Sequence, residues 1–279
     1  MKYFIDLEFI EGRQKKFFGS TKPTIDLISI GMVDEAGREF YAISKDFNIK
    51  EAWNRYDEKV NKQFPHGPEY IKEYWIRDNV LFPIFNEMIQ WELEAWNKQA
   101  QIIGHCSTKI YKFTYSDFKS LIKKYGQTNR EIASDICRFV YGDDDVFISA
   151  RELANCEITD KNLIPEFYAY YAAYDWVAFC WIFGKMLELP RSFPKYCRDL
   201  KQILDQKAEA KDWYYGRDIW SNTRKSGEDE LQVDDYPAPL EDKINKIKAM
   251  DSYPKQTNEH NAISDAKWNF ELYKFLKTL

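Results

Sequence analysis

Two acidic residues, Asp6 and Glu8, stand two positions apart in YFIDLEF (residues 3–9), inside a run of apolar and aromatic residues. In a strand, residues i and i+2 face the same side, so this spacing predicts two carboxylates side by side on one surface. Like charges at that distance repel each other, and burial among apolar neighbours adds a desolvation cost. The pattern therefore predicts that a positive charge lies between them.

Three further residues could complete an acidic site. Asp175 ends a Tyr-rich apolar run, and His260 and Asp265 flank the expected start of the last helix. Strand ends and helix starts both deliver side chains to the rim of a sheet, so four carboxylates can converge there. Carboxylate oxygens suit Mg²⁺ or Mn²⁺, and two such ions about 3.5–4 Å apart would clamp a phosphodiester for in-line attack. An imidazole at His260 would accept a proton from the attacking water.

The order Asp6-x-Glu8, then Asp175, then His260-x4-Asp265 resembles the DEDDh class of 3′-to-5′ exonucleases, which have a ribonuclease H-like fold. Within that class the chain resembles the family of the polyadenylate-specific exoribonuclease, ribonuclease AS. The resemblance lies in the segments YFIDLEFIEG, TIDLISIGMVDEAGREFYAIS, EFYAYYAAYDWVAFCWIFGKMLELPRSFPKYCRDL and NEHNAISDAKWN.

The resemblance implies roles for the five residues and properties for the whole protein. Asp6, Glu8 and Asp265 would hold two Mg²⁺ ions, with Mn²⁺ able to substitute. Asp175 would support the second ion directly or through water, and His260 would be the general base. The same resemblance implies single-stranded RNA with a free 3′ hydroxyl as substrate, a preference for adenylate tails, and a homodimer.

The rest of the chain predicts an α/β protein that forms one domain over residues 1–279. Its sheet would be a mixed, ribonuclease H-like sheet of about five strands, with the first three antiparallel and helices on both faces. Ile28, Ile30 and Met32 alternate with Ser29 and Gly31 in the second strand. The remaining elements expected are a central strand over 166–176, a short strand near 196–201, and helices over 79–95, 128–142, 177–190 and 263–279.

Three segments exceed the length expected of compact members of the resembling family. They fall at about 54–74, 97–160 and 206–256. The last is charged and lacks a sustained period, so we interpret it as an insertion or a mobile flap. Extra segments of this size can change the substrate preference and the dimer geometry, whereas the chemistry depends on the five residues alone.

Substrate contacts are predicted for Leu7 and Phe9 beside the acidic pair, for Trp176, and for Arg77 as a phosphate contact. Trp176 and its neighbour Tyr174 could stack on a base, although core packing is the preferred interpretation for both. The basic stretches at 13–22 and 191–195, which interleave Lys or Arg with Phe, fit a groove that follows the RNA backbone and fit solvated loops equally well.

Composition restricts the class of protein. Aromatic residues make up 17% of the chain, which excludes a disordered or fibrous protein. The net charge of −5 does not exclude a phosphate substrate, because two bound divalent cations would offset most of it. The acids at 6 and 8 interrupt the first apolar run, so neither a signal peptide nor a membrane partner is expected. Five cysteines without a CxxC pair favour a reduced, cytoplasmic setting.

The sequence therefore leads to a metal-dependent 3′-5′ exoribonuclease that releases nucleoside 5′-monophosphates. Two alternatives stay open. A DNA exonuclease or oligonucleotide hydrolase would use the same catalytic residues, because RNA is distinguished from DNA by contacts to the 2′ hydroxyl. A nucleic-acid-binding module without catalysis would keep the carboxylates only for metal-stabilised folding.

Overall fold

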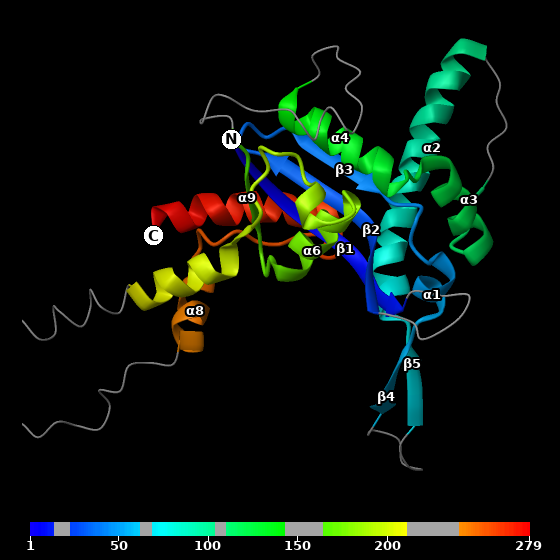
Figure 1. Cartoon of the computed structure of the whole chain (residues 1–279). Coiled ribbons are helices and arrows are strands. Elements are labelled where there is room, and N and C mark those ends of the chain that lie inside the picture. The colour runs from blue at the N-terminus through cyan, green and yellow to red at the C-terminus, as the bar shows by residue number, and fades with distance from the viewer. Residues whose placement is uncertain (14–22, 62–68, 104–109, 143–163, 211–239) are drawn as a thin grey trace, which may run out of the picture.

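The computed structural model describes residues 1–13, 23–61, 69–103, 110–142, 164–210 and 240–279. At its centre lies a mixed sheet with helices on both faces (Figure 1). The strands, in their order across the sheet, are β3 (Glu39–Ile43), β2 (Pro23–Asp34), β1 (Lys2–Arg13), β6 (Glu166–Ala169) and β7 (Arg198–Asp199). β1, β2 and β3 are antiparallel, whereas β6 and β7 run parallel to β1. The predicted mixed sheet of about five strands is confirmed.

The other elements surround this sheet. The α-helices are α1 (Ile49–Asn54), α2 (Phe82–Ile103), α3 (Tyr115–Tyr125), α4 (Asn129–Tyr141), α6 (Ala173–Ile182), α8 (Leu240–Lys248) and α9 (Ala262–Thr278), and residues 200–210 are also helical. Shorter elements are the π-helix η1 (Arg77–Leu81), the 3₁₀ helix η3 (Met186–Glu188) and a separate hairpin formed by β4 (Asp57–Asn61) and β5 (Glu69–Glu73), which projects from the body of the protein (Figure 1).

Alternation along β1 divides its side chains between the two faces of the sheet. Tyr3, Ile5 and Leu7 are buried in the cluster that α4 and α6 complete. Phe4 packs on the opposite face with α9 and α8, and Ile10 packs on that face with α2 and α3. Positions 6 and 8 therefore interrupt an apolar stripe between these two clusters.

The second strand contains one irregularity that the sequence did not predict. Ser29 lies opposite Glu8, but Leu27 lies opposite Phe9, so Ile28 is an extra residue in β2. As a result Ile28 packs in the cluster of α2 and α3, whereas Ile30 packs with α4 and α6. The sequence pattern predicted that Ile28 and Ile30 face the same side of the sheet, and this prediction is wrong for Ile28.

The predicted strand over 166–176 is also wrong beyond Ala169. The chain turns at Tyr171, whose φ of 55° is left-handed, and α6 then begins at Ala173. An unbroken apolar run does not distinguish a buried strand from a buried helix, because it has no period to read. The helix predicted over 177–190 starts earlier and ends at Ile182, where Gly184 with a φ of 102° leads into η3.

The other helices agree better with the sequence. α4 begins with a capping box in which Thr128 and Glu131 bond each other's backbone N–H groups, and ends at Gly142 with a φ of 94°. α2 and α9 lie where helices were predicted, and β7 lies within 196–201. Part of the segment 206–256 is ordered as α8. Residues 211–239, the acidic run 143–145 and the basic residues 14–22 lie outside the described residues.

Candidate active site

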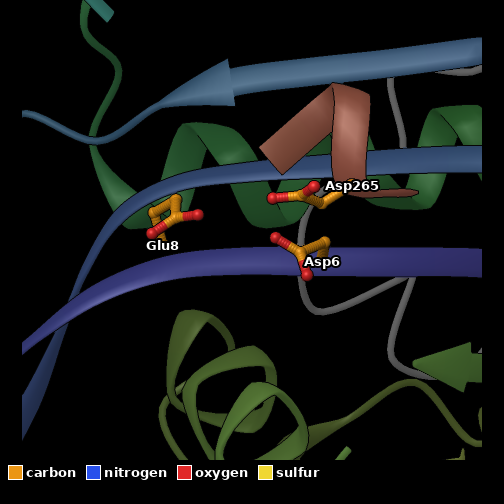
Figure 2. A group of neighbouring side chains, drawn as sticks. All are labelled: Asp6, Glu8 and Asp265. Carbon is orange, nitrogen blue, oxygen red and sulfur yellow. The ribbon is translucent and has the colours of Figure 1, made fainter. Parts of the chain in front are cut away.

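Three carboxylates meet above β1. Asp6 and Glu8 come from the strand and Asp265 comes from the first turn of α9, and one oxygen of each lies within 4.8 Å of the others. Figure 2 shows the three side chains directed toward a common space. Bonds of about 2.0–2.6 Å place two oxygen ligands of one divalent cation within roughly 4–5 Å of each other. The donor set and its spacing thus fit a Mg²⁺ or Mn²⁺ ion.

Gly31 brings α9 close to the strand. It lies directly opposite Asp6 in the ladder between β1 and β2. A β-carbon at Gly31 would lie 2.2 Å from the carbonyl oxygen of Ala262, the first residue of α9. Because glycine has no side chain, the start of the helix can rest on the sheet at this point, and Asp265 then lies beside Asp6.

Two further contacts hold Asp265 in place. Gln256 donates its side-chain N–H to Oδ1 at 2.6 Å, and the backbone N–H of His260 donates to Oδ2 at 2.8 Å. One turn along α9, Asn269 donates its side-chain N–H to the carbonyl oxygen of Ile5 at 2.9 Å. Among the described residues, the other side-chain atom of Asn269, Oδ1, has no hydrogen-bond partner although it is buried.

Asp175 reaches the same region from α6. Its side chain is buried, and its Oδ1 accepts the backbone N–H of Leu7 at 2.9 Å. The ladder between β6 and β1 ends at Phe4, so this N–H is not paired with β6. The Asp175 carboxylate therefore accepts a backbone N–H of β1 and also lies beside the three acids.

A cavity of about 330 Å³ contains all five residues that the sequence singled out. Its lining comprises Asp6, Leu7, Glu8, Phe9, Trp75, Tyr170, Asp175, Gln256, His260, Asp265, Trp268 and Asn269. His260 has a φ of 65°, and its ring meets the ring of Trp75 edge-on, with 4.7 Å between their centroids. The cavity thus brings the four carboxylates and the imidazole of the sequence prediction into one lining.

Electrostatics make this arrangement costly without a cation. Burial, together with the charges of Asp265 and Asp175, raises the pKa of Glu8 to about 8. Burial raises the pKa of Asp6 well above its usual value, and the charges of the other three acids add to this effect. Burial likewise raises the pKa of Asp175 to about 7 and raises the pKa of Asp265. The folded protein therefore resists ionisation of the cluster unless positive charge is supplied.

The residues predicted to contact substrate differ in whether the structure places them in the cavity. Phe9 lines the cavity and stacks on Tyr174 at 5.9 Å, and Tyr174 is 53% exposed, so the preferred core position for Tyr174 is wrong. Leu7 lines the cavity but buries its side chain in the core on the other face. Trp176 is buried against Phe179, which contradicts a stacking role for it.

Arg77 is not among the residues that line the cavity. Its guanidinium lies 4.0 Å from the centre of the Tyr74 ring and bonds Asp78 at 2.8 Å. Sequence reasoning missed Trp75, two residues earlier, which forms a wall of the cavity. It also missed Asn269, although an amide four residues after Asp265 lies on the same helix face and was a usable signal.

Fold and site together define a mixed α/β protein with a partly buried carboxylate cluster where a strand meets the first turns of two helices. No known family model matches the chain. The chain is similar to two proteins of Mycobacterium tuberculosis, 3′-5′ exoribonuclease Rv2179c of strain ATCC 25618 / H37Rv and 3′-5′ exoribonuclease MT2234.1 of strain CDC 1551 / Oshkosh. Each is 25% identical to it over 207 residues, which cover 74% of this chain and 76% of the relative. No helix in the described ranges is both long and apolar enough to cross a bilayer.

Proposed function

We propose that this protein is a metal-dependent 3′-5′ exoribonuclease of the DEDDh class, with a ribonuclease H-like fold. The observation that carries the proposal is the meeting of Asp6, Glu8 and Asp265 within 4.8 Å in a cavity that also contains Asp175 and His260. The names of the two mycobacterial relatives point to the same activity. The substrate would be single-stranded RNA with a free 3′ hydroxyl, and the products would be nucleoside 5′-monophosphates.

The metal site would use the four carboxylates. Asp6, Glu8 and Asp265 would hold the two Mg²⁺ ions, and Asp175 would support the second ion directly or through water. Bound divalent cations supply positive charge to the attacking and leaving oxygens of an in-line displacement. The same charge would offset the repulsion that raises the pKa values of these carboxyl groups.

His260 would be the general base. Its backbone is fixed by the bond to Asp265 and its ring by the contact with Trp75, so the imidazole would be held at the edge of the cavity. A base in that position accepts the proton of the attacking water as the phosphorus–oxygen bond forms. The leaving group is the 3′ oxygen of the preceding nucleotide, which remains on the shortened RNA.

An end-labelled oligonucleotide tests the activity directly. Incubation of 5′-labelled oligoadenylate with the protein and Mg²⁺ should give a ladder shortened from the 3′ end, and a chelator should prevent it. Asp265→Asn should abolish the ladder, whereas the exposed-site variant Glu58→Gln should not change it. An oligonucleotide that stays intact while a control nuclease digests it would reject the exoribonuclease and leave the DNA exonuclease and the non-catalytic binding module.

The substrate class needs a separate comparison. Matched oligomers of riboadenylate and deoxyriboadenylate distinguish an exoribonuclease from a DNA exonuclease, because only the former substrate has the 2′ hydroxyl. Homopolymers of the four bases test the adenylate preference that the ribonuclease AS-like segments imply. The homodimer stays a prediction of the same resemblance, and the cytoplasmic location stays a prediction from the cysteine pattern.

The role of His260 has its own test. We expect His260→Asn to lower kcat by about 10²–10⁴-fold, the usual contribution of a general base. Asparagine tolerates the left-handed backbone conformation of position 260, so folding and metal binding should be retained. A variant that keeps its rate would show that another group accepts the proton.

A further inference from the structure

Two more cavities continue from the catalytic one. A cavity of about 320 Å³ shares Phe9 and Trp75 with the catalytic cavity. It also shares Glu11 and Arg55 with a third cavity of about 720 Å³. The three cavities therefore adjoin one another, and together they form a path that starts at the carboxylates and follows the far half of β1.

Two exposed aromatic side chains of α6, Tyr174 and Trp181, line this path. Tyr174, Val177 and Trp181 are 53%, 40% and 40% exposed, and their spacing of three and four residues puts them on one face of α6. Tyr174 and Trp181 line the third cavity, and the ring of Tyr174 also stacks on Phe9 of the catalytic cavity. A row of large apolar groups that remains in solvent beside a site marks a binding surface more often than an isolated exposed residue does.

The charges along the path argue against phosphates as the groups it holds. Glu11, Glu51 and Asp57 line the second and third cavities. Arg55 lies among them, but it bonds Glu51 at 2.6 Å, so its charge is shared with a carboxylate. A ligand that enters here is therefore held by its flat, uncharged parts, with its anionic groups toward solvent.

We propose that Phe9, Trp75, Tyr174 and Trp181 form a stacking track for the bases of single-stranded RNA upstream of the bond that is cut. This inference rests on the proposed exoribonuclease function. The catalytic cavity holds the 3′ end of such a substrate, so the rest of the strand has to leave along a path that is continuous with that cavity. Base–aromatic stacking tolerates any base, which suits an enzyme that shortens a strand step by step.

Substrate length separates the track from the catalytic cavity. A dinucleotide occupies the catalytic cavity alone, whereas a ten-nucleotide oligoadenylate also reaches the track. We expect Trp181→Ala to raise KM for the longer substrate about tenfold with kcat unchanged, because the contact is equally present in the bound and transition states. Both constants for the dinucleotide should stay at their wild-type values, and Trp181→Phe should retain most of the affinity for the longer substrate.

Leu187 provides the matched control. It is 76% exposed, follows α6 by only a few residues, and lines none of the three cavities. Leu187→Ala should therefore leave both substrates unaffected. A second variant acts in the opposite direction, since Glu11→Gln removes a carboxylate from the path and should lower KM for the longer substrate only.

Direct binding keeps the two proposals distinguishable. In an Asp265→Asn background, fluorescence anisotropy of a labelled ten-nucleotide oligoadenylate should show weaker binding when Trp181→Ala is added, whether or not the wild-type protein cleaves RNA. Cleavage by the wild type with no effect of Trp181→Ala in either assay would reject the track alone. Specific binding without cleavage would reject the exonuclease proposal alone, and failure to bind the oligonucleotide would reject both.

Discussion

The carbonyl oxygen of Ala262 lies 2.2 Å from the position that a β-carbon on Gly31 would occupy. This contact sets the distance between α9 and the sheet, and Gly31 lies directly opposite Asp6. Any side chain at position 31 has to push the start of α9 away from the strand. The separation of Asp265 from Asp6 therefore depends on a residue with no functional group of its own.

Gly31→Ala should consequently impair both stability and the site. We expect a loss of about 1–3 kcal/mol in the free energy of unfolding, as is usual when a group is forced into a packed contact. Affinity for Mg²⁺ should fall with it, since Asp265 moves with the helix. Thermal unfolding with and without Mg²⁺ measures both effects. Gly37→Asn is the control, because position 37 has a φ of 85° that asparagine tolerates and open space around it. Equal losses of stability and of Mg²⁺ affinity in the two variants would contradict the packing argument.

Removal of one acid should have opposite effects on stability and activity. In protein dialysed against a chelator, Asp6→Asn replaces an acid whose ionised form is disfavoured by burial and by the neighbouring carboxylates, so the variant should be more stable than the wild type. With Mg²⁺ the order should reverse, and turnover should fall by more than about 100-fold, because the transition state loses charge stabilisation. Thermal unfolding and the oligoadenylate assay report the two effects. A metal-free variant less stable than the wild type would show that the cluster is not repulsive.

Stability should also depend on pH in a defined direction. Glu8 has a pKa of about 8 in the folded protein against 4.5 in the unfolded chain, and Asp175 has a pKa of about 7 against 3.8. Between these values the folded state binds more protons than the unfolded state, so the free energy of unfolding decreases as the pH rises. The contribution is complete below the unfolded values and is lost as the pH passes about 7–8.

Thermal unfolding of metal-free protein at a series of pH values checks this direction. The melting temperature should decrease toward alkaline pH, and Mg²⁺ should restore more of it at alkaline than at acidic pH, since the ion replaces bound protons. The double variant Asp6→Asn/Glu8→Gln should weaken the dependence. A melting temperature that rises toward alkaline pH would contradict the raised pKa values of Glu8 and Asp175.

Trp75 should affect catalysis through His260. Its ring meets the imidazole edge-on at 4.7 Å, and such a contact contributes about 0.5–1.5 kcal/mol to holding a side chain. We expect Trp75→Ala to lower kcat about tenfold at most, to change the pH profile of kcat, and to be largely rescued in Trp75→Phe. Tyr70→Ala, at a 65% exposed position on the hairpin that precedes Trp75, should leave kcat unchanged. An unaltered pH profile would limit Trp75 to substrate contact.

The sequence was sufficient where a short spacing determines geometry. The two-residue separation of Asp6 and Glu8 put both on one face of β1, because strand periodicity leaves no other arrangement. The N-terminal position of Asp265 in α9 followed from the apolar period of that helix. Asp175 reached the site although its secondary structure was assigned wrongly, since a strand end and a helix start lie at the same edge of the sheet.

The sequence was insufficient where packing between segments that are far apart in the chain determines the structure. The extra residue Ile28 in β2 and the hairpin that leads to Trp75 have no local signal, since β4 and β5 are mostly polar and pair only with each other. The contact of Gly31 with Ala262 joins residues more than 200 positions apart, and a glycine in a strand indicates close approach without naming the neighbour. Gln256 lies in a loop where a single amide carries no recognisable pattern.

The shortness of β6 has one more consequence. Because its ladder with β1 stops at Phe4, the sheet parts just before Asp6, and the backbone N–H of Leu7 is capped by Asp175 instead of by a neighbouring strand. A β6 extended by a few residues would run its own main chain through the gap and satisfy that N–H without any acid. The opening in which the carboxylates gather exists because hydrogen bonding between two central strands ends early, and lengthening β6 would close it even if every acidic residue were kept.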